Sequence, residues 1–290
     1  LGPVGGTQAG RLAQTLEPTL RDETLAPTYR AEALKLPSES DLARELGRNV
    51  DTDAILTARN TLRANVSAAM ADTLLGIYDS TAMDGAFSPD PESAGLRALR
   101  NAALDLMSAT GTDEATDRAF RHYRDATNMT DAITTLSILS HIPSPAREEA
   151  LEDFYARWQD DPLVLDKWFA VQARAARPDS VETAYRLLSH PKFSLKNPNR
   201  VRALIGSFAM ANPSGFNRAD GAGYRFLADQ ALKIDGFNPH VSARLLGAFE
   251  SWKTLEAGRQ AHAKAALECL SGAKLSTDAY EIVTKTLGSA

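Results

Sequence analysis

The side chains that most often carry chemistry are few and scattered in this sequence. It has five histidines and one cysteine in 290 residues, and no two histidines stand four residues apart as in an HExxH motif. A zinc site needs at least three such ligands held close together. We therefore expect no metal site built from this chain alone. Cys269 has no second ligand near it in the sequence, and it is predicted to be a small buried hydrophobic residue.

Motifs for covalent or phosphate chemistry are also missing. The sequence contains no G-x-G-x-x-G, Walker or G-x-S-x-G pattern. The carboxylate pairs Glu148-Glu149 and Asp160-Asp161 fall at predicted helix ends, and Asp161 directly precedes Pro162. A short carboxylate at such a position caps a helix, because it accepts hydrogen bonds from the free amides of the first turn. We expect the chain by itself to be catalytically inactive.

Arginines beside apolar stripes are the remaining candidates for a binding role. Arg200 and Arg202 lie in NPNRVRALIGSF (197–208), and Arg244 lies with His240 in NPHVSARLLGAF (238–249). The 3.6-residue period of a helix puts each of them at the edge of an apolar stripe. Periodicity alone predicts a solvated surface charge at each arginine, and the edge of a groove is the alternative.

Composition and charge exclude several classes of partner. The formal net charge is −5, the pI is about 5.6, and basic residues never form a run. These features do not indicate binding to nucleic acid or to an anionic membrane. Apolar runs are far shorter than the roughly 18 residues that a membrane span requires. The first ten residues lack the basic and apolar regions of a signal peptide, and together with the single cysteine this predicts a cytoplasmic protein.

Helical periodicity dominates the chain and predicts an all-α fold. A long amphipathic pattern runs from Asp51 to about Asp79, with Asp51 or Asp53 as its cap. Residues 1–10, which include four glycines, are predicted to be a linker or a vector-derived remnant, and residues 11–290 a single domain. Further helices are predicted near 93–109, 113–126, 130–141, 145–158, 162–175, 179–189, 198–211, 220–233, 238–251, 254–270 and 276–287.

The two Asn-Pro segments belong to a longer repeat. Pro198 and Pro239 stand 41 residues apart (239 − 198), and a looser copy begins 36 residues earlier at Pro162 (198 − 162). A helix pair that recurs at about 40 residues is typical of HEAT and armadillo proteins. We therefore predict a HEAT/armadillo-like, right-handed superhelical solenoid. Gly206 and Gly247 share one repeat position, which predicts a neighbouring helix too close for a Cβ atom.

Several segments together resemble the C-terminal helical domain of bacterial aminopeptidase N, a zinc-dependent aminopeptidase family of the HExxH class. The resemblance covers nearly all of the chain from about residue 11, and residues 165–249 are its most specific part. The segments are EALKLPS (32–38), RNAALDLMS (100–108), TNMTDA (127–132), LDKWF (165–169), NPNRVRALIGSFAMANP (197–213) and GFNPHVSARLL (236–246). The HExxH helix and the other domains of the family are missing from this sequence.

This resemblance implies a non-catalytic domain that caps the active-site chamber of a zinc aminopeptidase and contacts the distal part of a peptide. Arg202, Arg244 and His240 would face that chamber, although relatives often carry glutamine at the position of His240. The implied partners are short peptides and the catalytic and β-sandwich domains of the same bacterial polypeptide, which would hold the zinc. The alternative is a free-standing helical-repeat scaffold for protein interactions. An HExxH domain upstream in the same reading frame would favour the first interpretation.

Overall fold

The computed structural model describes residues 4–83 and 85–288, and within them the regular structure is helical. One isolated parallel bridge, between Val50 and Leu255, is the exception. The described residues form two compact units. The first contains residues up to Ser38 together with Thr57–Phe154, and the second contains Glu39–Leu56 together with the described residues from Tyr155 onward. The prediction of an all-α fold is confirmed.

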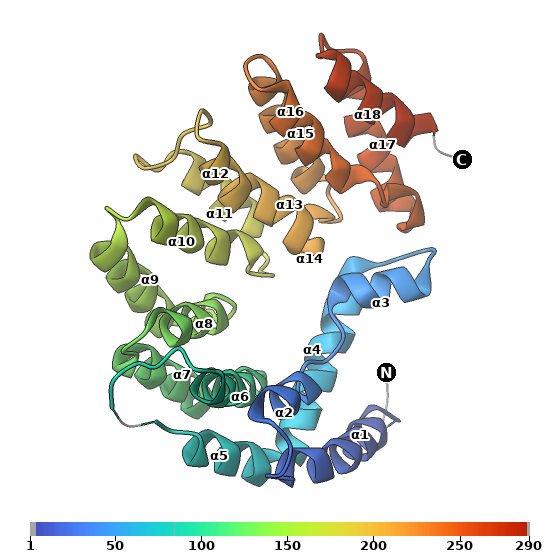
Figure 1. The fold of residues 1–290 in the computed structure, drawn as a ribbon. Helices are drawn as coiled ribbons and strands as arrows, with labels where there is room; N and C mark the ends of the chain where they lie inside the picture. The colour runs from blue at the N-terminus through green and yellow to red at the C-terminus, as the bar shows by residue number, and fades with distance from the viewer. Residues whose placement is uncertain (1–3, 84, 289–290) are drawn as a thin grey trace. The chain divides into compact units, whose positions relative to one another are not determined.

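The first unit is a set of helices packed around α6. In it, α2 and α5 both pack on α6, and α6 and α7 both pack on α8 (Figure 1). Its fully buried side chains include Leu74, Leu99, Leu104, Tyr123 and Leu136. The helices that lie in it wholly or in part are α1 (Val4–Arg21), α2 (Pro27–Ala33), α4 (Thr52–Ala69), α5 (Ala71–Ser80), α6 (Pro91–Ser108), α7 (Asp113–Asp125), α8 (Met129–Ser140) and α9 (Pro145–Trp158).

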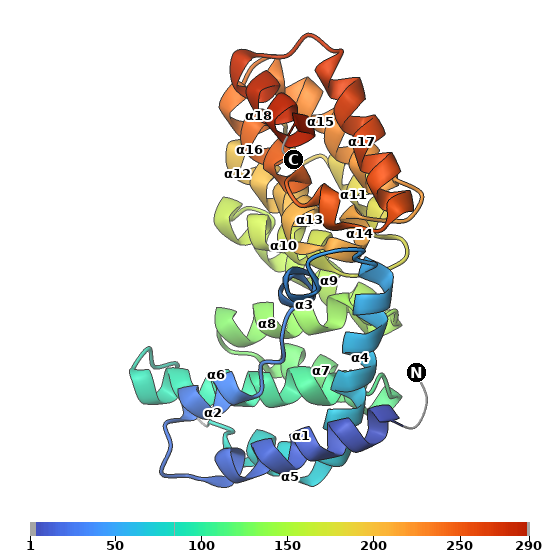
Figure 2. The same cartoon turned by 90° about the vertical axis from the view of Figure 1, so that its right-hand side faces the viewer.

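The second unit carries the repeated helix pairs that the sequence predicts. Phe208 and Phe226, both fully buried, meet edge to face with ring centroids 5.1 Å apart. Its elements after the α9 end are α10 (Pro162–Arg174), α11 (Ser180–Leu188), α12 (Pro198–Val201), η1 (Arg202–Gly206), α13 (Ser207–Ala211), α14 (Pro213–Phe216), α15 (Ala222–Asp235), α16 (Pro239–Leu246), η2 (Gly247–Phe249), η3 (Trp252–Thr254), α17 (Ala257–Ser271) and α18 (Thr277–Gly288). α17 packs against α15 and α18, as both views of the fold show (Figures 1 and 2).

The helix starts follow from the capping residues that the sequence contains. Asp161 accepts hydrogen bonds from two first-turn amides of α10, and Asn197 does the same for α12. Asn238 accepts one from the amide of Val241 in α16. Each cap is followed by a proline in the first turn, where a missing N–H costs nothing. The predicted capping role of Asp161 is confirmed, and Asp51 caps α4 in the same way.

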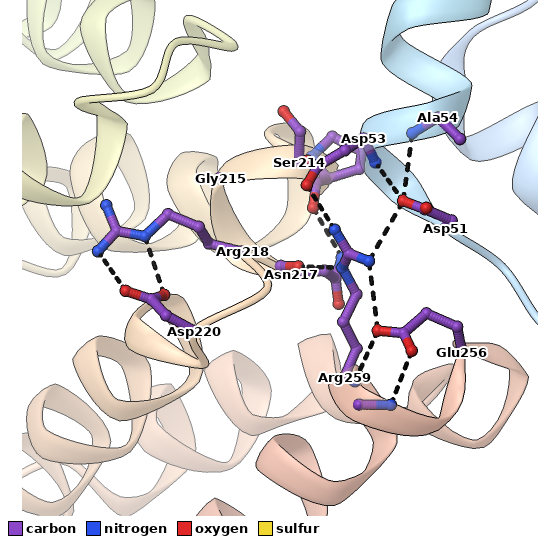
Figure 3. A network of polar contacts seen from close by, with 12 residues as sticks. Asp51, Asp53, Ala54, Ser214, Gly215, Asn217, Arg218, Asp220, Glu256 and Arg259 are labelled. Atoms are coloured by element: carbon purple, nitrogen blue, oxygen red, sulfur yellow. Dashed lines mark hydrogen bonds and ion pairs between the residues drawn. The ribbon is translucent and has the colours of Figure 1, made fainter.

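A buried arginine ties residues 47–56 to α17 inside the second unit. Arg259 is only 4% exposed, and its Nη2 lies 2.6 Å from Asp53 Oδ2 while its Nη1 lies 3.2 Å from Asp51 Oδ1 (Figure 3). Its Nε donates to the carbonyl of Asn217 at 2.6 Å, and Glu256, the N-cap residue of α17, completes the group. The bridge at Val50 lies beside this network, since the amide of Val50 donates to the carbonyl of Thr254. Helix α3 (Glu39–Leu46) belongs to the same unit.

The first 80 residues differ from the sequence prediction, which includes no helix before Asp51, whereas the structure has α1, α2 and α3 there. Residues 4–10, predicted as part of a linker, are the first residues of α1. Burial of Ala9 and Ala13 explains this, because tertiary packing outweighs the low helix propensity of glycine. The predicted helix over 51–79 is two helices, which meet at Met70 with φ −118°. Apolar residues continue at three- and four-residue spacing across the break, so periodicity does not detect it.

The predicted role of the shared glycines is wrong. A Cβ on Gly247 would meet nothing within 4 Å, and one on Gly206 would make ordinary van der Waals contacts, the nearest with Leu245 Cδ2 at 3.7 Å. The close approach occurs instead at Gly223, where a Cβ would collide with the backbone carbonyls of Phe216 and Gly215. Cys269 is also exposed rather than buried, because the stripe that α17 buries runs through Ala263, Ala266, Leu267 and Leu270 and leaves it out.

Candidate functional site

A cavity in the second unit brings the predicted site residues together. Arg202, His240 and Arg244 all line one pocket of about 470 Å³ between α10, the α12–α13 segment and α16. The volume is in the range of pockets that hold small ligands. The remaining lining residues are Arg174, Pro198, Gly206, Ser207, Met210, Ala211, Val241 and Leu245. We call this cavity the arginine pocket.

The Asn-Pro segments position the two predicted arginines. Asn197 and Pro198 start the segment that carries Arg202, and Asn238 and Pro239 start the helix that carries His240 and Arg244. Buried residues hold each segment in place, Leu204 in the first and Leu245 in the second. The polar side chains at the edges of these apolar stripes therefore come to line one hollow.

The helix that carries Arg202 is not regular. Residues Arg202–Gly206 form a π-helical turn, in which the amide of Ser207 bonds the carbonyl of Arg202. Such turns insert one residue into an α-helix and are frequent at functional sites. The insertion changes the angular register between Arg202 and the residues that follow, including Met210, which also lines the pocket. Sequence periodicity treats 198–211 as one helix and gives no sign of this turn.

The lining of the arginine pocket is positively charged. Its lining contains three arginines and one histidine but no Asp or Glu. Arg202 donates to the side-chain oxygen of Asn199. Among the described residues, Arg174 and Arg244 have no carboxylate within ion-pair distance. Met210 and the buried Leu245 supply an apolar wall. The pocket therefore offers guanidinium donors beside apolar surface, which suits carbonyl or carboxylate groups of an extended chain.

Arg174 is a member of the pocket that the sequence did not predict. It lies in the last turn of α10, and its side chain is exposed. A basic residue in the last turn of a helix is ordinarily explained by the negative end of the helix dipole. Nothing in the repeat pattern distinguishes it from such a residue, and only the packing of α10 beside η1 brings it to the pocket.

Arg200 is not a surface charge, and the prediction that it is solvated is wrong. It is 5% exposed, its Nε lies 3.1 Å from Asp166 Oδ1, and its guanidinium carbon lies 4.9 Å from the ring centre of Phe169. Burial raises the pKa of Asp166, against the opposing effect of Arg200 and Arg202. Burial likewise lowers the pKa of His190 in the same cluster, and the positive charge of Arg200 adds to that effect. Helix α10 covers the side of segment 197–208 that carries Arg200, and periodicity alone could not reveal this contact.

Two kinds of feature are absent from the described residues, a cluster of metal ligands and a membrane-spanning helix. In ranges 4–83 and 85–288, no group of three or more His, Cys, Asp or Glu side chains could hold a metal ion. Over the same ranges, none of the helices combines the length and the apolar character needed to cross a bilayer.

Comparison with known proteins agrees with the fold. The model of a family described as "Domain of unknown function (DUF3458_C) ARM repeats" matches residues 5–288. Aminopeptidase N of Caulobacter vibrioides is 40% identical over 96% of this chain, and that of Escherichia coli is 36% identical over 95%. In both cases the match covers 32% of the relative, so the chain spans about a third of the length of these relatives.

A solved structure is similar over almost the whole chain. The crystal structure of Legionella pneumophila aminopeptidase A in complex with aspartic acid superimposes with a TM-score of 0.87 at 26% identity, and the match covers 99% of this chain and 36% of that one. The resemblance stated from the sequence motifs is confirmed by these matches. The chain belongs to the DUF3458_C family of ARM-repeat domains and matches the C-terminal helical domain of an aminopeptidase.

Proposed function

We propose that this chain is the non-catalytic helical domain of a zinc aminopeptidase that removes N-terminal residues from peptides. In this proposal it forms one wall of the active-site chamber, and the zinc and the reacting groups belong to the remainder of the polypeptide. Two observations support it. The relatives are named aminopeptidase N and are about three times as long as the match, and this chain presents a cavity with three guanidinium groups.

The arginine pocket would bind the part of the peptide that extends away from the metal. An aminopeptidase holds the free N-terminus at its reaction centre, so the following residues reach the opposite wall. Arg202 and Arg244 can donate to peptide carbonyls or to a terminal carboxylate, and His240 can donate or accept a hydrogen bond beside them. The single observation that carries the proposal is the convergence of these three side chains on one cavity whose lining includes no Asp or Glu.

Enclosure of the arginine pocket by the rest of the polypeptide would determine how much these contacts contribute to the free energy of peptide binding. A charge-assisted hydrogen bond shielded from bulk water contributes about 1.5–3 kcal/mol, whereas an exposed ion pair contributes about 0–1 kcal/mol. The first range corresponds to a change of about 10- to 150-fold in affinity. A closed chamber would also keep folded proteins out, which makes short peptides the expected substrates.

The test uses the full-length enzyme and a pair of substrates. Arg244→Ala should raise KM about tenfold or more for a tripeptide, and should change KM little for a chromogenic substrate with a single amino-acid residue. Arg225→Ala is the matched control, because Arg225 is an exposed arginine of α15 outside the pocket. Equal effects of Arg244→Ala on both substrates would contradict a distal contact.

A second test asks whether this chain alone carries out the reaction or binds zinc. This chain alone should show no peptidase turnover and no stoichiometric zinc. Turnover together with one zinc per chain would overturn the proposal that the chemistry lies elsewhere in the polypeptide.

A further inference from the structure

A second cavity of the second unit has a lining unlike that of the arginine pocket. Its volume is about 550 Å³, and it lies between α11, the segment 189–196 that follows this helix, and α15. Its lining comes from residues 185–196 and 230–233, which the structure describes without a gap. It contains Lys196 and Lys233 but no Asp, Glu or Arg, and it shares no residue with the arginine pocket. We call this cavity the lysine pocket.

Two packed helices frame the lysine pocket. Tyr185 and Leu188 stand three residues apart on α11, and Gln230 and Lys233 stand three residues apart on α15, so each pair lies on one face of its helix. The two helices pack against each other, and the ring of Tyr185 meets that of Phe226 edge to face at 4.9 Å. The relative positions of the lining residues on these helices are therefore set by the core of the unit.

Hydrogen bonds within the segment 189–196 hold the third wall. The amide of Phe193 donates to the carbonyl of His190 at 2.8 Å, and the amide of Lys196 donates to Ser194 Oγ at 3.3 Å. The ring of Phe193 also lies 5.9 Å from that of Phe169. This wall thus brings an aromatic ring, a hydroxyl group and a cation to the same cavity.

The side chain of Gln230 needs a partner that the chain does not supply. It is 2% exposed and lines the cavity, yet its carboxamide hydrogen-bonds to no other residue in the described part of the chain. Buried polar side chains nearly always have a hydrogen-bond partner, because burial without one forfeits their bonds to water. A carboxamide carries an acceptor and two donors side by side, so a second amide is complementary to it. An amide group of a ligand would satisfy Gln230.

The two lysines supply positive charge to the same cavity. Neither Lys196 nor Lys233 has a carboxylate within ion-pair distance among the residues that the structure describes. Asp229 of α15 is exposed and does not line the cavity. It acts on Tyr185, whose pKa is raised by burial and raised further by this carboxylate. The lysine pocket itself therefore presents cations to an anionic group of a ligand.

We propose that the lysine pocket binds a small N-acylated amino acid, in which a carboxylate and an amide nitrogen share one carbon atom. The carboxylate would lie against Lys196 and Lys233, and the amide would pair with Gln230. Leu188 and Phe193 line the same cavity and offer contacts for an apolar side chain. The volume is sufficient for a molecule of this size. This site is separate from the arginine pocket and does not depend on the function proposed above.

Calorimetric titration of this chain with N-acetyl-L-leucine tests the proposal. The compound should bind saturably at millimolar concentration or below. N-acetyl-L-leucinamide lacks the charge and 4-methylpentanoate lacks the amide, so each should bind about tenfold or more weakly. Absence of saturable binding, or equal binding by either analogue, would overturn the proposal. These measurements use the unaltered protein and do not depend on any variant folding.

Lysine variants then locate the site. The double variant Lys196→Gln/Lys233→Gln should weaken binding about tenfold or more. Lys274→Gln, which alters an exposed lysine outside both pockets, and Arg244→Gln, which alters the arginine pocket, should leave binding unchanged. If Arg244→Gln abolishes binding and the double lysine variant does not, the ligand occupies the arginine pocket and the assignment is wrong.

Gln230→Leu separates recognition of the amide from recognition of the charge. In this variant N-acetyl-L-leucine and 4-methylpentanoate should bind equally, because a leucine side chain cannot pair with an amide. Its thermal midpoint should be no lower than that of the unaltered protein, since the change removes a buried amide without a partner. A remaining preference for N-acetyl-L-leucine, or a lower midpoint, would contradict the proposed contact. Either failure would leave the chamber-wall proposal untouched.

Discussion

Replacing Arg200 by methionine should leave the partly buried carboxylate of Asp166 without its ion-pair partner, with only the weaker effect of Arg202 remaining. Removal of one member of a buried pair costs about 3–5 kcal/mol, because its partner stays charged without a counter-ion. Arg200 is 5% exposed and the side chain of Asp166 is 18% exposed, so the penalty falls near the lower end. Loss of the contact with Phe169 adds about 1 kcal/mol. We expect a loss of about 3–4 kcal/mol in the free energy of unfolding at pH 7.

The pH dependence of this loss follows from the direction in which the pKa of Asp166 is shifted. Burial already raises that pKa, and removal of Arg200 takes away an opposing effect, so the pKa rises further. The folded variant then binds more protons than its unfolded chain at pH values between the ordinary Asp pKa of 3.8 and the raised value. Stability therefore increases as pH falls through that window. The deficit of Arg200→Met should be largest at pH 7 and shrink toward pH 4.

Urea unfolding followed by circular dichroism at pH 7 and at about pH 4.5 measures both effects. The double variant Arg200→Met/Asp166→Leu is the decisive comparison. Replacement of both members of a buried pair by apolar residues is often neutral or stabilising by about 1–4 kcal/mol, so the double variant should be close to the unaltered protein. The stranded-charge reasoning is refuted if the double variant is as unstable as Arg200→Met, or if the deficit does not change with pH.

Three further predictions follow from the described contacts. Arg259→Met should lower the free energy of unfolding in urea by about 2 kcal/mol, less than Arg200→Met does. The carboxylates of Asp51 and Asp53 that it leaves behind are about half exposed and stay hydrated. A loss as large as that of Arg200→Met would contradict this reasoning. Gly206→Ala should be neutral or should stabilise the fold by up to about 1 kcal/mol. Gly223→Ala should destabilise it by more than about 3 kcal/mol or prevent folding, because the new Cβ meets backbone carbonyls. Similar thermal midpoints for the two variants would be inconsistent with the packing. Burial lowers the pKa of His122 in the folded protein below its ordinary 6.5. Its contribution to stability is therefore present above pH 6.5 and is lost as pH falls through the folded pKa. An imidazole NMR titration with a midpoint at or above 6.5 would contradict this prediction.

Much of the fold could be predicted from local patterns. Caps such as Asp161 and Asn238 act through amides two or three residues away, so their effect is contained in the sequence around them. The 41-residue repeat similarly places equivalent helices in equivalent surroundings. The family resemblance, rather than periodicity, implies that Arg202, His240 and Arg244 face a common chamber, and the structure puts them in one pocket. Their contact with a peptide remains a prediction.

The errors lie where distant parts of the chain meet. Arg200 and Arg202 are two residues apart and chemically identical, yet α10 buries only the first of them. Arg174 reaches the arginine pocket from another helix, and no local pattern marks it. The glycine that cannot be replaced is Gly223 rather than a member of the repeated Gly206 and Gly247 pair, because the close approach depends on the path of residues 215–216.

The sequence by itself determined the helical class and the helix starts that carry a capping residue, because periods and caps act over a few residues. Its repeated segments and family motifs also indicated the repeat and the family. The tertiary structure decided which charges are buried, where the helix deviates to a π turn, and which side chains share a cavity. Burial and charge pairing depend on neighbours tens or hundreds of residues away, as in the contact of Arg259 with Asp53. The free energy of such a charge is set by whether those neighbours exclude water from it.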